Sequence, residues 1–324
     1  MRELLILADF QPASVRKLRE AAGPDFRVDV AADSEPMVRY AALRTAEVIL
    51  GEPDLTELTI APQLRWLQLT WSGADRYTRA LDFPRNVALT TATGAFGVTI
   101  SEYVLGGILT LCRRLPAYRS YQQRGVARSA GPEKLLFGGT ALILGAGDIG
   151  TNVAQRLKAF GMSVVGVCRH RRPLPAGFDE VWTLAEAEKL LPLADVVVCC
   201  LPDTPETRGY FDRARLLRLR EDAIFVNVGR GSLVVTDDLA AVLAEGRLFG
   251  AVLDVTDPEP LPKDHPLRRM RNVVLTPHVA GVSLGAAPET ERKIVAICCD
   301  NLRRYRSSWP LRNQVDLLTG YRRR

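Results

Sequence analysis

The sequence predicts an α/β protein of two domains, each built on a parallel β-sheet. Short segments rich in Val, Ile and Leu alternate with helical segments over residues 1–93 and again over residues 140–278. Such alternation is typical of parallel sheets covered by helices. The chain of 324 residues is also long enough for two domains of roughly 150 residues each.

Five strands and two helices are expected in residues 1–93. Each strand segment is apolar and ends at a polar residue or glycine, whereas the helical segments carry apolar residues at helical spacing. The strands are expected at 4–9, 26–32, 46–51, 64–70 and 87–93, and the helices at 12–23 and 36–45.

A long apolar helix is expected from residue 97, hydrophobic enough to lie between the two domains. Pro116 should bend this helix or restart its end. After the polar segment 122–134, six further strands fit one doubly wound sheet. They are expected at 140–147, 162–168, 195–202, 223–230, 251–256 and 273–278.

The last segment, residues 289–316, is predicted to be a helix that ends near Ser307, followed by a polar tail with Pro310. Because this segment is short of strands, we expect it to return to the first domain. That domain would then be discontinuous, and the chain would cross a hinge twice.

Composition and charge argue against several classes of protein. The chain has a net charge of +6, but its arginines form no continuous stripe of the kind that binds nucleic acid. Its six cysteines lack zinc-ligand spacing with the three histidines, so we expect buried free thiols and no metal site. No apolar run reaches the roughly 20 residues that cross a bilayer, and Asp9 comes too early for a signal peptide. These observations predict a cytoplasmic protein without a membrane partner.

Three glycines in LILGAGDIG, residues 142–150, predict a dinucleotide-binding turn. A lone G-x-G-x-x-G is a weak signal, but here it follows a predicted strand and precedes a helix and a second strand. In such a unit Gly145 permits the tight turn, Gly147 lets the backbone approach a pyrophosphate, and Gly150 allows close helix packing. The anion then rests on the helix N-terminus. The alternative is a tight turn with no ligand.

The end of the following strand indicates which dinucleotide binds. An acid there would bind a ribose 2′-hydroxyl, but this chain has Cys168, followed by Arg169, His170, Arg171 and Arg172. Arginines bind a 2′-phosphate through forked, charge-assisted hydrogen bonds. The sequence therefore favours NADP (NADPH) over NAD, and a solvated basic loop is the alternative.

Three polar residues at different strand ends point to reduction of a 2-keto acid. Ligands of parallel sheets bind beyond the carboxyl ends of the strands, and Arg230, Glu259 and His278 are expected there. As a nicotinamide delivers its hydride, a protonated His278 could donate the proton that quenches the alkoxide. Arg230 would hold the carboxylate or keto oxygen. Glu259 would orient the imidazole and favour its charged form.

Each of the three also has an ordinary structural explanation. His278 could be a turn histidine, Arg230 could pair with surface acids, and Glu259 could be a solvated loop residue. Their occurrence together with the glycine turn favours catalysis. The other two histidines, His170 and His265, lie in a basic and a polar loop and are weaker candidates.

Seven segments spread over nearly the whole chain form a distinctive series: LQLTWSGADR (67–76), GAFGVTISEYVLGGIL (94–109), LGAGDIGTNVAQRLKAFGMSVVGV (144–167), LPDTPETRGYFD (201–212), FVNVGRGSLVVTDDL (225–239), GAVLDVTDPEPLP (250–262) and NVVLTPHVAG (272–281). In sequence and in order they resemble the D-2-hydroxyacid dehydrogenase family. The basic loop is similar to that of the family's NADP-preferring glyoxylate/hydroxypyruvate reductases.

The resemblance implies a Rossmann dinucleotide-binding domain, residues 98–285, inserted into a smaller flavodoxin-like α/β substrate-binding domain, residues 1–97 and 286–324. It also implies a homodimer formed through the nucleotide domain, and carboxylate binding by backbone amides around Ser72, with Trp71 either walling the pocket or packed in the core. The implied catalytic residues are Arg230, Glu259 and His278. The implied substrate-binding residues are Trp71, Ser72, Gly73, Ala74, Arg230 and His278. The implied cofactor contacts are Gly145, Gly147, Asp148, Ile149, Gly150, Arg169, Arg171, Arg172, Leu201, Pro202, Thr207, Val228, Gly229 and Asp254.

The chain departs from the family's pattern at two places. Many members have Glu-His where this chain has Glu102-Tyr103, and a short Thr/Ser-Pro turn where it reads VSLGAAPETER, residues 282–292. These departures leave substrate identity and domain closure open. Glyoxylate and hydroxypyruvate are the first expected substrates. A dinucleotide-sensing protein similar to the related corepressors, and an NAD-linked dehydrogenase acting oxidatively, are the alternatives.

Overall fold

In the computed structural model, which describes residues 1–32, 34–170, 173–281, 284–285 and 287–323, the chain folds into two compact units. Unit 1 comprises Met1–Phe96 and Val282–Arg324, and unit 2 comprises Gly97–Gly281. The chain crosses between the units after residues 96 and 281, where 97 and 285 were expected. Gly97, the first residue of unit 2, donates its amide to Asp148 of the same unit.

Unit 1 is built on a five-stranded parallel sheet with the strand order β2-β1-β3-β4-β5. This is the order of flavodoxin-like folds. All five expected strands are present; four lie within their apolar segments, whereas β1 begins two residues before its segment. Their bounds are β1 Arg2–Ile6, β2 Phe26–Val30, β3 Val48–Leu50, β4 Trp66–Gln68 and β5 Ala88–Thr90.

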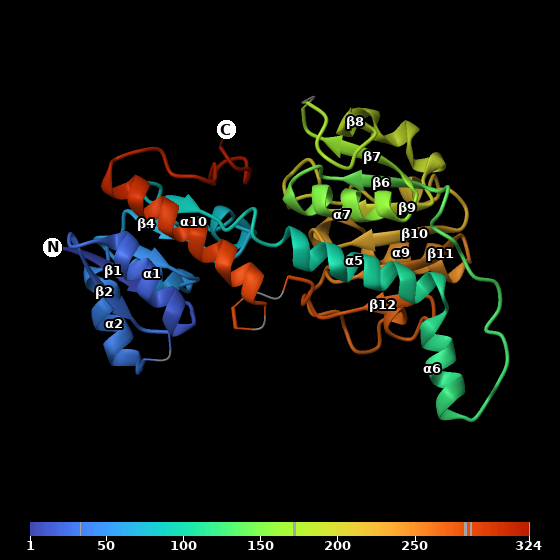
Figure 1. Cartoon of the computed structure of the whole chain (residues 1–324), viewed down its shortest axis with the longest axis horizontal. Helices are drawn as coiled ribbons and strands as arrows, with labels where there is room; N and C mark the ends of the chain where they lie inside the picture. Colours follow the sequence, from blue (N-terminus) through green and yellow to red (C-terminus); the bar gives the residue numbers. More distant parts are fainter. Residues whose placement is uncertain (33, 171–172, 282–283, 286, 324) are drawn as a thin grey trace. The chain divides into compact units, whose positions relative to one another are not determined.

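In the described residues of unit 1 there are five helices, including the last helix of the chain. Figure 1 shows α1 and α10 side by side, as their packing requires. The buried Asn301 of α10 donates a hydrogen bond to Gln68 Oε1 in β4 at 2.8 Å, which ties the returning segment to the sheet. The helices are α1 Pro12–Ala22, α2 Pro36–Thr45, α3 Leu55–Thr59, α4 Asp75–Thr78 and α10 Pro288–Arg306.

Unit 2 contains a seven-stranded parallel sheet in the order β12-β11-β10-β9-β6-β7-β8. The strand order reverses at β6, as in a Rossmann fold. The strands are β6 Thr140–Leu144, β7 Ser163–Cys168, β8 Glu180–Thr183, β9 Val196–Cys199, β10 Ala223–Asn227, β11 Leu248–Leu253 and β12 Val273–Leu275. These two parallel sheets confirm the α/β fold class.

The expectation of six strands in this sheet was wrong. The additional strand β8 pairs with β7, and all four of its residues are exposed or half-buried. A strand at the edge of a sheet buries less side-chain surface than a central strand. The sequence of β8 accordingly lacks the apolar run by which the other strands were identified.

The expected long helix is two helices, and both belong to unit 2. Helix α5 (Gly97–Cys112) packs on α7 (Asp148–Ala159) and on the sheet, where a Cβ at Gly107 would lie 2.5 Å from Val252 Cγ1. Helix α6 (Leu115–Gln123) restarts with Pro116 in its first turn. The other helices are α8 Arg213–Leu216 and α9 Thr236–Ala244, with 3₁₀ helices η1 Leu184–Lys189, η2 Leu191–Leu193, η3 Gly231–Leu233 and η4 Pro266–Arg268.

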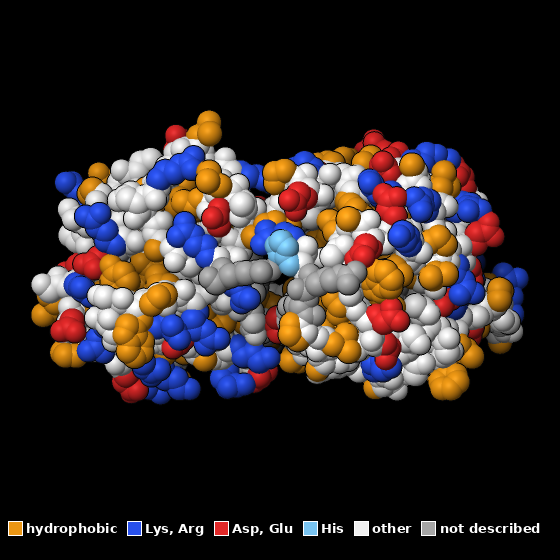
Figure 2. Space-filling view, turned by 90° about the horizontal axis from the view of Figure 1, so that it is seen from above, with side chains coloured by type: hydrophobic (Ala, Val, Ile, Leu, Met, Phe, Trp, Pro, Cys, Tyr) orange, Lys and Arg blue, Asp and Glu red, His pale blue; other side chains and the backbone are white. Residues whose placement is uncertain are grey.

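The state of the cysteines and the distribution of surface charge can be compared with the expectations from the sequence. All six cysteines are free; Cys168 and Cys200 are half-buried rather than buried as expected, and the other four are buried. Figure 2 shows basic and acidic side chains interspersed over the face that it draws. In the described part of the chain, no helix is long and apolar enough to cross a membrane, and no group of three His, Cys, Asp or Glu residues could hold a metal ion.

Candidate active site

The predicted site residues of unit 2 follow the carboxyl ends of its parallel strands. The glycine turn follows β6, Arg230 follows β10, Asp254 and Glu259 follow β11, and His278 follows β12. Strands β10, β11 and β12 are neighbours in the sheet. The side chains that follow them therefore leave the sheet at the same edge, where ligands of such folds bind.

The three glycines of the turn have different surroundings. Gly145 has φ +106°, and a Cβ there would lie 2.8 Å from the carbonyl oxygen of Cys200. A Cβ at Gly150 would lie 2.0 Å from the carbonyl oxygen of Gly145, so α7 could not pack as it does. A Cβ at Gly147 would meet no described atom within 4 Å. The fold thus requires glycine at positions 145 and 150, whereas the space next to Gly147 is open.

Helix α7 starts directly after Gly147, which is its N-cap residue. The first amides of a helix have no intrahelical acceptor, so the amides of Asp148 and Ile149 lie at the positive end of the helix dipole. The Asp148 carboxylate accepts the amide of Gly97 at 2.8 Å and so joins the start of α5 to the start of α7. This structural role of the Asp148 side chain was not predicted.

The basic loop follows β7, whose last residue is Cys168. The thiol of Cys168 donates a hydrogen bond to the carbonyl oxygen of His170 at 2.9 Å. Arg169 and His170 are exposed. Arg171 and Arg172 lie outside the described residues.

The loop after β9 carries Leu201, Pro202 and Thr207. Thr207 is 1% exposed, and its hydroxyl donates to the carbonyl oxygen of Pro202 at 2.7 Å and accepts the amide of Thr204 at 2.9 Å. The expected contact of Thr207 with the cofactor stays a prediction. The side chain holds the loop from inside, and the sequence could not reveal this because threonine is as common in turns as in ligand contacts.

Arg230 is positioned by its neighbours in the chain. A Cβ at Gly229 would lie 2.6 Å from the carbonyl oxygen of Leu201, and a Cβ at Gly231 would lie 2.0 Å from that of Thr256. The buried Asn227 donates to the carbonyl oxygen of Arg230 at 2.9 Å and accepts the amide of Gly229 at 3.1 Å. The backbone is therefore held tightly on both sides of Arg230.

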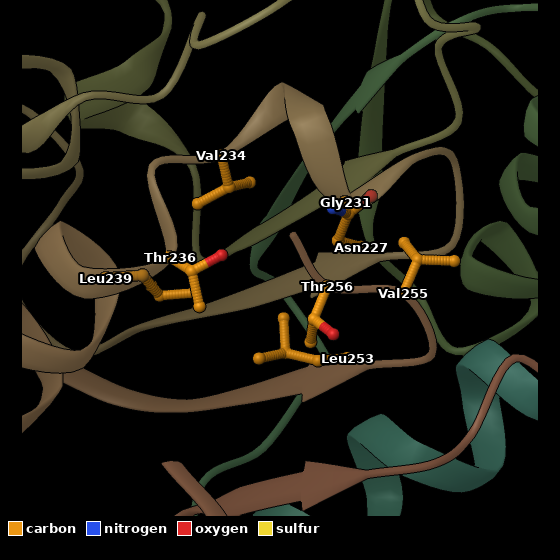
Figure 3. Close-up of a pocket in the computed structure, with 8 residues that line it drawn as sticks. All are labelled: Asn227, Gly231, Val234, Thr236, Leu239, Leu253, Val255 and Thr256. Carbon is orange, nitrogen blue, oxygen red and sulfur yellow. The ribbon is translucent and has the colours of Figure 1, made fainter. Parts of the chain in front are cut away.

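Figure 3 shows a small cavity behind this turn. Asn227, Gly231 and Thr256 border one side of it, and the side chains of Val234 and Leu239 border the other. The cavity is lined largely by apolar side chains of the core. The residues that line this cavity support the turn that carries Arg230, and the cavity is not the predicted ligand site.

His278 and Glu259 are in direct contact, as their predicted roles require. His278 Nδ1 lies 2.7 Å from Glu259 Oε1, and both side chains are less than half exposed, 46% and 42%. A carboxylate bound to one ring nitrogen fixes the orientation of the ring and leaves the other nitrogen for a reacting group. His278 has φ 57°, a left-handed conformation that is uncommon for residues other than glycine.

Asp254 supports the segment that carries His278. Its carboxylate accepts the hydroxyl of Thr276 at 2.6 Å and the amides of Val279 and Ala280 at 2.8 and 2.9 Å. The backbone amide of His278 donates to the carbonyl oxygen of Asp254 at 2.8 Å. This role of Asp254, for which the sequence indicates only a cofactor contact, joins residues more than 20 positions apart and was not predicted.

In unit 1 the predicted substrate-binding residues form the turn between β4 and α4. Trp71 is 49% exposed and therefore is not a core tryptophan. The carboxylate of Glu52, a residue that sequence analysis missed, accepts the amide of Thr70 at 2.6 Å and also that of Trp71. Burial raises the pKa of Glu52 above its ordinary value, although these hydrogen bonds act in the opposite direction. Ser72 and Gly73 are half-buried, and Ala74 is buried.

Several known proteins are similar to this chain in sequence and in fold. A family model described as "D-isomer specific 2-hydroxyacid dehydrogenase, NAD binding domain" matches residues 105–280. The chain is 35% identical to glyoxylate/hydroxypyruvate reductase A of Serratia proteamaculans over 225 residues, and this alignment covers 68% of each of the two chains. Among solved structures, a D-isomer specific 2-hydroxyacid dehydrogenase family protein from Aeromonas salmonicida is 37% identical, with a TM-score of 0.86 and coverage of 98% of this chain and 99% of that one. An NADPH-dependent glyoxylate/hydroxypyruvate reductase from Sinorhizobium meliloti, in complex with NADP and sulfate, is 27% identical, with a TM-score of 0.83 and coverage of 99% and 100%.

Proposed function

The chain belongs to the D-isomer specific 2-hydroxyacid dehydrogenase family, and from this premise we propose that it reduces small 2-keto acids to D-2-hydroxy acids with NADPH. Family membership makes it an oxidoreductase that uses a nicotinamide dinucleotide. The observation that carries the proposal is the hydrogen bond of 2.7 Å between His278 and Glu259 at the ligand-binding edge of the sheet. Glyoxylate and hydroxypyruvate are the proposed substrates, in agreement with the names of the reductases above.

The turn after β6 fits a dinucleotide pyrophosphate. A ligand can approach the backbone at Gly147, where a side chain would project into otherwise open space, and the first amides of α7 point to the same region. We propose that Gly145, Gly147, Asp148, Ile149 and Gly150 hold the pyrophosphate through their backbone, with Leu201, Pro202, Val228, Gly229 and Asp254 bordering the rest of the cofactor. When bound, the nicotinamide supplies a hydride to the keto carbon.

His278 is the proposed proton donor for the keto oxygen. Nδ1 is bound to Glu259, which leaves Nε2 for the substrate. The Glu259 carboxylate stabilises the imidazolium, and the charged imidazolium both donates the proton and attracts the oxygen on which negative charge develops. After the transfer His278 is neutral and Glu259 remains ionised, so the site recovers by taking one proton from solvent.

Arg230 is the proposed ligand for the substrate's carboxylate or keto oxygen. Its guanidinium is permanently charged and can donate two parallel hydrogen bonds, so it stabilises developing alkoxide charge without a proton transfer. We propose that the turn of unit 1 around Trp71, Ser72, Gly73 and Ala74 also binds the substrate carboxylate through backbone amides. Glu52 then has a supporting role, because it holds the amides of Thr70 and Trp71 at the start of this turn.

The preference for NADPH is proposed from the loop after β7. An acid that would repel a 2′-phosphate is replaced there by Cys168, and Arg169 is followed in the sequence by Arg171 and Arg172. The NADP bound to the Sinorhizobium meliloti reductase supports this preference.

Replacement of Arg169 and Arg171 by serine should raise KM for NADPH by about 100-fold or more and change KM for NADH by less than about threefold. The loss of charge-assisted hydrogen bonds to a 2′-phosphate affects NADPH alone, at roughly 1.5–3 kcal/mol for each such bond. Steady-state kinetics with both cofactors measure this. The control is Arg16→Ser with Arg19→Ser, which removes the same charge from the exposed surface of α1. Equal effects on both cofactors would contradict recognition of the 2′-phosphate.

Absorbance of reduced nicotinamide tests the proposed function directly. Purified protein should consume NADPH faster than NADH with glyoxylate or hydroxypyruvate, and a bulkier 2-keto acid should rank below both. Binding of NADPH without turnover of any of these acids would contradict the proposed reaction and favour a sensing protein. Faster turnover with NADH would contradict only the cofactor preference.

We also propose that the protein is a homodimer formed through unit 2. Helix α6 has no buried residue, and the segment that follows it exposes Leu135 at 72% and Phe137 at 82%. Light scattering should give twice the chain mass of 35.7 kDa, and Leu135→Ser with Phe137→Ser should shift the protein to the monomer. The control is Leu81→Ser, at a residue of unit 1 that is 93% exposed. A monomeric wild type would contradict the proposal. The cytoplasmic location expected from the sequence stays a prediction.

A further inference from the structure

Tyr103, where the chain departs from the family's pattern, contacts the segment that carries His278. It lies in α5, and its hydroxyl is 2.5 Å from Thr276 Oγ1, a residue 173 positions later in the chain. Both side chains are partly buried. Within unit 2 this contact joins the helix beside the glycine turn to the residue two positions before His278.

The hydrogen bonds of Thr276 have a defined direction. Its hydroxyl donates its one proton to Asp254 Oδ1 at 2.6 Å, so towards Tyr103 it can only accept. Burial, and to a smaller extent the charge of Asp254, raises the pKa of Tyr103 to about 12, although the hydrogen bond with Thr276 acts in the opposite direction. The phenol therefore keeps its proton at neutral pH and donates it to Thr276.

The chain of hydrogen bonds ends on the backbone around His278. The Asp254 carboxylate accepts the amides of the two residues that follow His278, and the Asp254 carbonyl oxygen accepts the amide of His278 itself. Since His278 has a left-handed φ of 57°, its conformation is unfavourable for a residue other than glycine and persists only where the surroundings impose it. Asp254 provides three hydrogen bonds that impose it.

We propose that Tyr103 is a positioning residue for His278 and acts through Thr276 and Asp254. The inference rests on the proposed role of His278 as proton donor. Tyr103 donates to the threonine hydroxyl, the polarised hydroxyl donates more strongly to the carboxylate, and the carboxylate is held where it binds the amides of residues 279 and 280. A tyrosine in α5 thereby fixes the turn that directs the imidazole towards Glu259, and small displacements of a proton donor are costly in rate.

Three substitutions separate this role from general packing. Tyr103→Phe removes the hydroxyl at nearly constant volume, and Thr276→Val removes the intermediate hydroxyl, whereas Thr276→Ser retains it. The control is Tyr40→Phe, at an exposed tyrosine of α2 in unit 1. Melting temperature establishes that each variant is folded. Amide hydrogen exchange at Val279 and Ala280, in the full chain without substrate, is the primary measurement, and kcat and KM for hydroxypyruvate follow.

We expect Tyr103→Phe and Thr276→Val each to accelerate exchange at these amides and to lower kcat by roughly three- to tenfold, with KM nearly unchanged, as for loss of one hydrogen bond. Thr276→Ser should restore both quantities, and Tyr40→Phe should match the wild type. The double variant should be no slower than Thr276→Val alone, because the two residues act in one chain.

Unchanged exchange in Tyr103→Phe would overturn the proposal whatever the rate. Faster exchange with unchanged kcat would overturn the claim that this anchoring serves catalysis. If the wild type reduced no keto acid, the proposed function would fail separately. The exchange comparison would then still decide whether Tyr103 holds the turn at His278.

Discussion

Replacement of His278 by glutamine should lower kcat for 2-keto acid reduction by about 100- to 10,000-fold, the usual range for loss of a positioned general acid. Glutamine can still donate a hydrogen bond to Glu259 but cannot deliver a proton to the alkoxide. Affinity for NADPH, measured by fluorescence titration, should stay within about twofold, because the glycine turn is unchanged. The same substitution at His265, which binds Asp237 and the amide of Leu267, is the control.

The pH dependence of the wild type provides a second test of His278. Only the protonated imidazole can donate, so the reductive kcat should fall as pH rises and His278 loses its proton. The oxidative kcat should rise over the same pH range, because that direction needs the neutral imidazole as the acceptor. Glu259→Gln should lower the reductive rate less than His278→Gln does, since it removes the partner and not the donor. A reductive kcat that does not fall at any higher pH at which the protein stays folded would exclude His278 as the donor.

Replacement of Arg230 by glutamine should lower kcat/KM for the keto acid by about 100- to 1,000-fold or more, as for the loss of a donor that stabilises an oxyanion. Arg230→Lys should restore only part of this, because lysine keeps the charge but not the forked geometry. Gly229 and Gly231 hold the backbone on either side of Arg230, so the variant should fold normally. Steady-state kinetics and cofactor titration are the measurements.

The control for Arg230 is Arg247→Gln, which removes an arginine paired with Glu221 on the surface of the same unit. This variant should match the wild type in kcat/KM. Arg230→Gln should bind NADPH normally while it loses turnover, which distinguishes an enzyme from a nucleotide-sensing protein. Turnover at the wild-type rate in Arg230→Gln would remove Arg230 from the site.

Much of the fold could be predicted because its signals are local. Parallel strands that are buried on both faces form continuous apolar runs, so eleven of the twelve strands were identified. The edge strand β8 was missed because it lacks such a run. The bond from Gly97 to Asp148 could not be predicted either, since it joins positions 51 apart.

The candidate site also contains residues whose roles could be predicted from the sequence and residues whose roles could not. Gly145, Gly147 and Gly150 could be assigned separate roles, because the requirements of a strand–turn–helix unit lie within nine residues. The roles of Thr207, Asp254 and Glu52 could not be predicted. A hydroxyl or carboxylate has many possible partners along the chain, and residue type alone does not indicate which one it binds.

By itself, the sequence determined the α/β class, the glycine turn, the basic loop and the three polar residues after the strands, because each depends on neighbours within a few positions. Only the tertiary structure decided how these residues are held. The contact of Glu259 with His278 spans 19 positions, that of Asp254 with the same segment spans 22 to 26, and that of Tyr103 with Thr276 spans 173. Hydrogen bonds need atoms within about 3 Å in a set direction, and strands far apart in the chain achieve this only after the sheet has formed.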